Sequence, residues 1–335
     1  MEHNKFVVSV RCMTFNQALY IVDALNGFTM QDTNFPFVCC IVDDASTDDE
    51  PEILRKYLQD HFDLKDKSVV RNEEKNDYTL CFAQHKEKRN CFFAVLWLKY
   101  NHYGSQDMKY RKLEYISELE GPAKYLAICE GDDYWIDPNK LQKQVDYLER
   151  HPDYTLIGSN GIIMYTDVNK GIEYFNNHHE LREVSFAELV NTWAFPTASL
   201  CFRRDIYDHY PSWSKELHFG DDIIVMTCAI HGKVATTGEL SCVYRKGSGI
   251  TKEMDKRQEY MSAQHKLFYS HLLEDTGDKY KDVLLARIER DERNRMYWHL
   301  RSKSVVLAAL RFPKRTSGVM VQVIKSFIKK CLKIV

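Results

Sequence analysis

Residues 37–61 read FVCCIVDDASTDDEPEILRKYLQDH, and this stretch decides the fold class. It starts with the apolar run Phe37–Val42, which is typical of a β-strand buried on both faces of a sheet. An acidic loop follows, and Glu50–His61 then has the composition of a helix with Pro51 in its first turn. A buried strand that leads directly into a helix predicts a βα unit of a parallel sheet.

The same pattern occurs on both sides of this stretch. A strand is expected at Phe6–Cys12, followed by a break at Thr14–Asn16 and a helix at Gln17–Gly27. Another strand is expected at Lys124–Cys129, with a helix at Asn139–His151. The chain is therefore expected to be an α/β protein that contains parallel βαβ units.

The rest of the chain gives weaker signals. The region Asp60–Gly121 is long and polar, and we expect insertions or excursions from the fold at Glu73–Asn90 and Gly104–Gly121. Lys233–Tyr244 is expected to hold a pair of strands, and the chain is expected to be helical from about Gln258. The other expected elements are strands at Phe92–Leu98, Tyr154–Tyr165 and Ala198–Phe202 and helices at Phe186–Asn191 and Asp221–Ile230.

Composition bounds the class of protein. The 335 residues are 44% hydrophobic and 28% charged, as in a soluble globular protein, and the net charge of −2 argues against a polyanion-binding chain. Ten cysteines without CxxC pairs predict buried thiols in a reducing cytoplasm. Met1–Lys5 does not resemble a signal peptide, and no apolar run has transmembrane length.

Three polar loops are expected at the carboxyl ends of strands: Thr14–Asn16, Asp43–Asp49 and Glu130–Asp133. In open α/β sheets ligands bind at this edge, so the loops predict one shared site. The alternative for the second loop is helix capping, which Ser46 and Asp48 would satisfy without any ligand. Capping explains Asp43 and Asp44 less well, because they lie directly against the strand end.

The loop Glu130–Asp133 contains three carboxylates within four residues. Such groups repel one another when they lose water, and a divalent cation relieves the repulsion. Mg²⁺ or Mn²⁺, shared with a diphosphate, suits oxygen ligands of this kind. The alternative is a solvated acidic turn; a calcium loop of the EF-hand type lacks its spacing here.

Three stretches of the sequence resemble one protein family. VSVRCMTFNQALYIVDAL, IVDDASTDDEPEIL and AICEGDDYWIDPNKLQKQVDYLERHPD are similar to the family 2 glycosyltransferases, which have the GT-A fold. The EGDDYW run is especially like bacterial members that build cell-surface polysaccharides. The resemblance covers about residues 5–251, apart from the 60–121 region. It implies a Rossmann-like nucleotide-binding half with a mixed central sheet, and a C-terminal helical extension.

The resemblance also implies a nucleotide-sugar site. Asp44 would accept a hydrogen bond from the base, expected to be uracil, while Asp132 and Asp133 would hold the ribose and a divalent cation (Mn²⁺ or Mg²⁺), with the order of the two left open. The other implied donor-binding residues are Thr14, Asn16, Asp43 and Glu130.

The resemblance places the catalytic base at the start of the helix that begins at Asp221, with Asp222 as the second choice. Helix capping is the alternative for both. The base would take a proton from an acceptor hydroxyl, and one in-line displacement would invert the anomeric carbon. Thr197 and Ser199 would line the acceptor side or else form a plain turn into a strand. Trp135 and Trp193 would each stack on a sugar or else belong to the core.

One departure concerns the cation. Many family members have a His ligand after a Tyr-Arg pair, but here the stretch is Tyr244-Arg245-Lys246. A protonated lysine does not bind a metal, whereas Arg245 would neutralise the diphosphate. We therefore expect a more open metal site.

The expected domains are 1–250, with a nucleotide-sugar half at 1–133 and an acceptor half at 134–250, and a helical extension at 251–335. Nine Lys/Arg and no Asp/Glu lie in residues 301–335, and residues 319–335 form a basic amphipathic pattern. It predicts contact with an anionic membrane surface on the cytoplasmic side, or a helix packed on the domain.

The function expected is transfer from a UDP-sugar to a glycan or lipid-linked acceptor, with no nucleic-acid partner. A nucleotidyltransferase and a non-catalytic nucleotide- or glycan-binding protein stay as alternatives.

Overall fold

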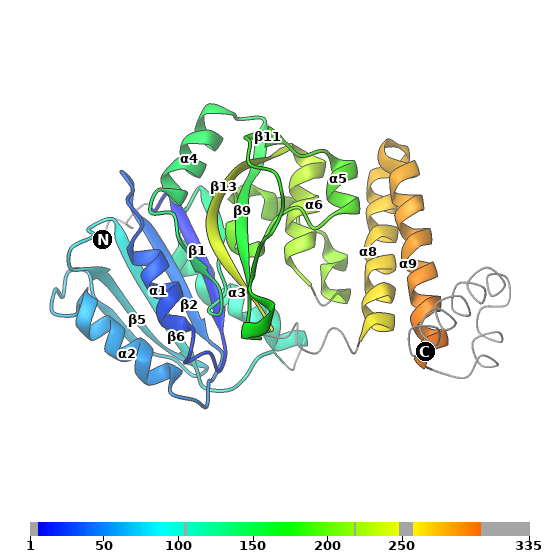
Figure 1. The fold of residues 1–335 in the computed structure, drawn as a ribbon. Coiled ribbons are helices and arrows are strands. Elements are labelled where there is room, and N and C mark those ends of the chain that lie inside the picture. Colours follow the sequence, from blue (N-terminus) through cyan, green and yellow to red (C-terminus); the bar gives the residue numbers. More distant parts are fainter. Residues whose placement is uncertain (1–5, 104–105, 218, 248–256, 303–335) are drawn as a thin grey trace. The chain divides into compact units, whose positions relative to one another are not determined.

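The computed structural model describes residues 6–103, 106–217, 219–247 and 257–302. Its contacts divide the chain into two units, the first containing residues 1–212 and 220–249 and the second residues 213–219 and 250–335. The first unit is an α/β body, and the second holds the last two helices (Figure 1).

One mixed sheet runs through the described residues of the first unit. Its strand order is β11-β13-β9-β12-β7-β1-β2-β6-β5-β3, with β10 beside β9, β4 beside β5 and β8 beside β13. The amino-terminal strands are β1 (Val8–Thr14), β2 (Phe37–Asp43), β3 (Phe62–Asp63), β4 (Arg71–Glu74), β5 (Tyr78–His85), β6 (Cys91–Leu98) and β7 (Tyr125–Ile128). The others are β8 (Tyr134–Trp135), β9 (Tyr154–Tyr165), β10 (Ile172–Tyr174), β11 (Arg182–Glu183), β12 (Cys201–Arg203) and β13 (Lys233–Lys246).

Strands β7, β1, β2 and β6 are parallel neighbours, so the ends of β7, β1 and β2 meet at one edge. Every residue of β2 is buried, as the apolar run predicts. Its side chains alternate between two cores: Phe37, Cys39 and Ile41 face one, and Val38, Cys40 and Val42 face the other.

Helices cover both faces of this parallel part (Figure 1). Buried side chains of α1 (Ile21–Thr29), α2 (Glu50–His61) and α4 (Lys140–Arg150) belong to the first core. Ile116 and Leu119 of α3 (Gln106–Glu120) belong to the second. The carboxyl edge of the sheet therefore opens between helices that anchor its loops from both sides.

The remaining elements of the first unit are α5 (Phe186–Asn191), α6 (Asp221–His231) and short 3₁₀ turns, η1 (Val168–Lys170), η2 (Thr197–Ser199), η3 (Arg204–His209) and η4 (Ser212–Glu216), the last shared with the second unit. The second unit contains α8 (Gln258–Thr276), η5 (Gly277–Tyr280) and α9 (Lys281–Ser302). Residues 319–335 lie outside the described residues.

Three sequence expectations were wrong. Glu73–Asn90 is not an insertion, because β4 and β5 form an antiparallel hairpin that extends the sheet. The Gly104–Gly121 segment supplies α3. Lys233–Tyr244 is one strand rather than two, because it runs beside β9 with its register shifted around Gly238, which has φ +72°.

No helix among the described residues is long and apolar enough to cross a membrane. The nine cysteines in the described part of the chain are all buried free thiols.

Candidate functional site at the carboxyl edge of the sheet

A buried glutamate, Glu50 at the start of α2, joins the loops that follow β1 and β2. Its carboxylate accepts hydrogen bonds from the Thr14 hydroxyl, from the backbone N–H of Gln17 at 2.7 Å and from the Ser46 hydroxyl at 3.0 Å. Burial, the largest influence, raises the pKa of Glu50. Thr14 thus serves the loop structure as well as lying at the expected site.

Asn16 ties the same two loops together from the outside. Its backbone is in the left-handed region, with φ 53°. The side-chain oxygen accepts from the backbone N–H of Thr47 at 2.8 Å, and the Asn16 N–H donates to the Ser46 hydroxyl at 2.8 Å. The exposed Asn16 therefore fixes the shape of the loop edge where the nucleotide was expected.

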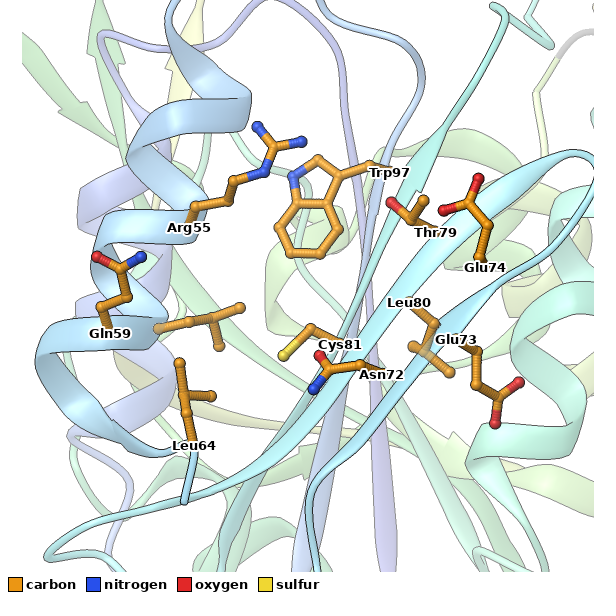
Figure 2. A pocket seen from close by; sticks show the side chains of 11 residues that line it. Arg55, Gln59, Leu64, Asn72, Glu73, Glu74, Thr79, Leu80, Cys81 and Trp97 are labelled. Carbon is orange, nitrogen blue, oxygen red and sulfur yellow. The ribbon is translucent and has the colours of Figure 1, made fainter. Parts of the chain in front are cut away.

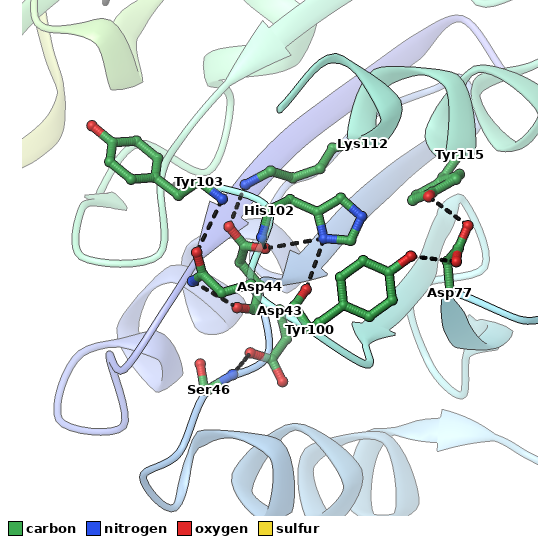
Figure 3. A network of polar contacts seen from close by, with 10 residues as sticks. Asp43, Asp44, Ser46, Asp77, Tyr100, His102, Tyr103, Lys112 and Tyr115 are labelled. Carbon is green, nitrogen blue, oxygen red and sulfur yellow. Dashed lines mark hydrogen bonds and ion pairs between the residues drawn. The ribbon is translucent and has the colours of Figure 1, made fainter. Parts of the chain in front are cut away.

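Asp43 ends β2 and Asp44 follows it, and their carboxylates make different contacts (Figure 3). Asp43 is buried and accepts from the Ser46 N–H at 2.9 Å, which supports the loop; burial raises its pKa. Asp44 is also buried, and its carboxylate accepts from the His102 N–H at 2.7 Å and forms an ion pair with Lys112 of α3. Asp44, which the sequence analysis expects to bind the nucleotide base, is therefore held in place by Lys112 of α3.

The acidic turn after β7 packs directly on the end of β1. Glu130 accepts from the backbone N–H of Met13 at 3.1 Å. Gly131 leaves no room for a side chain, because a Cβ there would lie 2.4 Å from the Thr14 hydroxyl and from the Gln17 side-chain oxygen. The two strand ends therefore approach closely only because residue 131 is glycine.

Asp133 and Arg245 form the other side of this turn. Asp133 is buried and accepts from the Arg245 backbone N–H at 2.8 Å; burial, followed by the charge of Asp132, raises its pKa. The Arg245 guanidinium donates to the Asp132 carbonyl at 2.8 Å, pairs with Asp23 and lies 4.5 Å from the Tyr134 ring centroid. Arg245 thus holds the turn, and its expected contact with the diphosphate stays a prediction.

Asp221, the first residue of α6, belongs to the same site. One carboxylate oxygen accepts from the Thr197 hydroxyl at 2.8 Å, and the other accepts from the Asp222 N–H at 3.0 Å. Burial and the charge of Asp132 raise the pKa of Glu130 to about 8, and the charge of Asp221 acts in the same direction. The acids after β7 and at the start of α6 therefore share one electrostatic environment.

Two expected acceptor-side residues lie in the core instead. Trp135 is 1% exposed, and its indole N–H donates to the Ala198 carbonyl at 2.7 Å, so its ring is not available to stack on a sugar. Ser199 is fully buried. Trp193 is different, because it is 49% exposed and its ring meets Phe175 and Tyr244 edge-on.

A divalent cation fits this edge only if it shares its ligands with a substrate. Within the described ranges, no three His, Cys, Asp or Glu side chains converge to hold a metal ion. Asp133 is committed to the backbone of β13, which favours Asp132 as the ligand. Burial, followed by the charge of Asp132, raises the pKa of Glu130, and a cation bound with a diphosphate would favour its ionised form.

Comparisons with known proteins agree with this arrangement. Residues 9–79, which span β1, β2 and the loops joined by Glu50, match the family described as glycosyl transferase family 2. This part of the chain is similar to family 2 glycosyltransferases, and we call the α/β unit that contains it the family 2 domain. The mixed sheet in the described residues of this unit has the GT-A fold.

The curated relatives of the family 2 domain include the uncharacterized proteins Mb1547 of Mycobacterium bovis and Rv1520 of Mycobacterium tuberculosis. Each is 32% identical over 240 residues, which is 71% of this chain and 58% of the relative. The chain thus spans less than two thirds of the length of these relatives.

Solved structures share the fold of the family 2 domain. S. aureus TarS residues 1–349, solved with UDP-GlcNAc, has a TM-score of 0.54 and 16% identity, covering 94% of this chain and 76% of that one. A mannosyltransferase of Pyrobaculum calidifontis, PcManGT, solved with GDP-Man and Mn²⁺, has a TM-score of 0.52 and 13% identity, covering 95% and 83%.

Two residues of the family 2 domain site were not found from sequence. Glu50 looked like an ordinary acidic residue in the first turn of a helix, although it lies beside the loop that holds Asp43 and Asp44. Lys112 lies in the segment read as an excursion. A helical reading of that segment would have drawn attention to it, because a buried lysine needs a carboxylate partner.

Proposed function

We propose that the family 2 domain transfers a sugar from a UDP-sugar to a glycan or lipid-linked acceptor in surface polysaccharide biosynthesis. The observation that carries the proposal is Asp221, whose carboxylate is fixed by Thr197 and acts electrostatically on the acidic turn after β7. A carboxylate held beside a diphosphate-binding edge is what an acceptor-activating base requires.

The donor would bind along the edge formed by the ends of β1, β2 and β7. TarS was solved with UDP and with UDP-GlcNAc, and PcManGT with GDP-Man, which supports a nucleotide-sugar donor for the same fold. Asp44 would face the base, where its carboxylate accepts an N–H as it now accepts that of His102. Glu50 would keep the loops around Thr14 and Asn16 in place.

The acceptor would approach Asp221. The acceptor hydroxyl gives its proton to the Asp221 carboxylate as its oxygen bonds to the anomeric carbon. The bond from that carbon to the diphosphate breaks at the same time, and its electron pair leaves with the nucleoside diphosphate. One displacement from the opposite face inverts the anomeric configuration. The half-exposed ring of Trp193 is available to contact an acceptor sugar.

A divalent cation, as PcManGT has with Mn²⁺, would be held by Asp132 and would supply positive charge to the departing diphosphate. Asp133 and Arg245 would act through the backbone, by fixing the turn that carries Asp132.

The test compares Asp221→Asn with Asp222→Asn. The full chain is incubated with UDP-glucose, UDP-galactose, UDP-GlcNAc or GDP-mannose and Mn²⁺, and release of nucleoside diphosphate is measured. Asp221→Asn should lower the rate by about 100-fold or more while donor binding survives. Asp222→Asn should stay within a few-fold of the wild type. An unchanged rate in Asp221→Asn would refute the assignment, and donor binding without turnover would favour a non-catalytic binding protein.

A further inference from the structure

A groove lies between α2 and the β4–β5 hairpin, separate from the acidic edge (Figure 2). Its volume is about 410 Å³, within the range of small-molecule binding sites. Leu58 and Leu64 line one side, and Leu80 and Cys81 of β5 line the other. The groove therefore has an apolar floor, and polar side chains form the rest of its lining.

Trp97 of β6 carries an unsatisfied donor in this groove. The side chain is 9% exposed, and its indole N–H has no hydrogen-bond partner within the described part of the chain. The Arg55 guanidinium lies 5.1 Å from its ring centroid, beside the same groove (Figure 2). Because a buried donor without an acceptor is costly, a ligand oxygen at this point would be favoured.

The charges around the groove are already compensated. Each charged side chain that lines it is within ion-pair distance of an oppositely charged neighbour, so the lining leaves no unpaired charge to attract a strongly ionic ligand. The pairs are Arg71–Glu73, Lys75–Glu73, Lys99–Glu74 and Arg55–Glu52. The groove therefore suits a neutral ligand.

Uncharged polar groups complete the lining. The amides of Gln59 and Asn72 and the hydroxyl of Thr79 line the groove and make no side-chain hydrogen bond among the described residues. Together with the Trp97 N–H they offer both donors and acceptors above an apolar floor. Hydroxyl groups and the C–H faces of sugar rings complement such a surface, and we propose that this groove binds a neutral oligosaccharide.

The position of the groove gives the oligosaccharide a role. Trp97 pairs in register with Asp43, so the groove begins one strand away from the loops at the acidic edge. A glycan held there would be kept close to the domain between transfers. This role, though not the binding itself, rests on the proposed glycosyl transfer.

The test uses the full chain and three probes: cellotetraose, maltotetraose and chitotetraose. Saturation-transfer NMR and titration should show binding of at least one probe. Trp97→Phe, which keeps a ring but removes the N–H, should weaken that binding by about three- to tenfold. Asn72→Ala, an exposed change that keeps the core intact, should weaken it by a similar factor. Lys56→Ala, exposed on α2 and outside the lining, is the matched control.

Two outcomes would overturn the proposal: no binding of any probe by the wild type, or binding that Trp97→Phe and Asn72→Ala leave unchanged. Stabilisation by UDP-sugars is measured on the same variants and should not change. A wild-type chain that binds a tetrasaccharide but is not stabilised by any UDP-sugar would instead count against the proposed function alone.

Discussion

At the scale of single residues, the site depends on side chains that connect loops. Glu50 joins the ends of β1 and β2, and Arg245 joins β13 to the acidic turn. Both are buried charged groups whose hydrogen bonds are satisfied by neighbouring elements, so each fixes a geometry that the loops alone would not keep. The acids expected to touch the donor are positioned by residues that need not touch it.

Replacing Glu50 with Gln should disturb both loops. The amide keeps the size of the side chain but turns one of its two acceptors into a donor, which then faces the donors of Thr14, Gln17 and Ser46. We expect a loss of about 1–3 kcal/mol in the free energy of unfolding and weaker donor binding.

Urea denaturation and titration with a UDP-sugar check this result. Glu52→Gln is the matched control, because Glu52 is exposed on the same helix. Equal effects of the two substitutions would show that Glu50 does not hold the loops.

At the scale of elements, the apolar strands and the helices that follow them could be predicted from the sequence, and β2 and α2 begin at Phe37 and Glu50 as expected. The β4–β5 hairpin could not, because β4 is Arg-Asn-Glu-Glu and carries no apolar alternation. Helix α3 was missed for a related reason, since it is rich in charged residues. Tertiary contacts fix α3 on the sheet, through the packing of Ile116 and Leu119 and the ion pair of Lys112 with Asp44.

The site residues could also be predicted only where they lie next to a predictable strand end. The acidic loops after β2 and β7 were found because strand ends are predictable, and both lie at one edge. The partner of Asp44 was not, because Lys112 arrives from α3. Trp135 and Ser199 were assigned to the acceptor side because sequence does not tell which way a side chain points.

Replacing Lys112 with Met tests how α3 anchors the β2 loop. The substitution leaves the Asp44 carboxylate buried without its cation, and we expect a loss of about 3–5 kcal/mol in the free energy of unfolding. Lys112→Met combined with Asp44→Asn should recover part of this loss, because the uncompensated charge is removed.

Chemical denaturation of the wild type, Lys112→Met, Asp44→Asn and the double variant gives the coupling energy between Lys112 and Asp44. Arg111→Met, an exposed change one position earlier on α3, should cost little. Additive effects of the Lys112 and Asp44 substitutions would contradict a stabilising ion pair.

At the scale of the whole molecule, the chain combines the α/β unit with a second, helical unit and a basic C-terminal sequence. Residues 319–335 carry Lys325, Lys329, Lys330 and Lys333 and no acidic residue. A basic amphipathic sequence binds anionic lipid surfaces through apolar contact and charge together. We propose that this sequence brings the enzyme to lipid-linked acceptors.

The full chain should therefore pellet with phosphatidylglycerol vesicles and much less with phosphatidylcholine vesicles. Added salt should reduce the pelleting, because it screens the lysines. A chain that ends at residue 318 should stay in the supernatant. Complete pelleting of this shorter chain would exclude the tail as the membrane contact.

The central claim is that the edge formed by β1, β2 and β7 binds a nucleotide sugar together with a divalent cation. The most direct measurement is the thermal unfolding midpoint of the full chain with nucleotide sugars, in the presence and absence of Mn²⁺. We predict that a UDP-sugar with Mn²⁺ raises the midpoint more than either alone, and that Asp132→Asn removes the effect of Mn²⁺. A midpoint that does not respond to any nucleotide sugar, with or without Mn²⁺, would contradict the account.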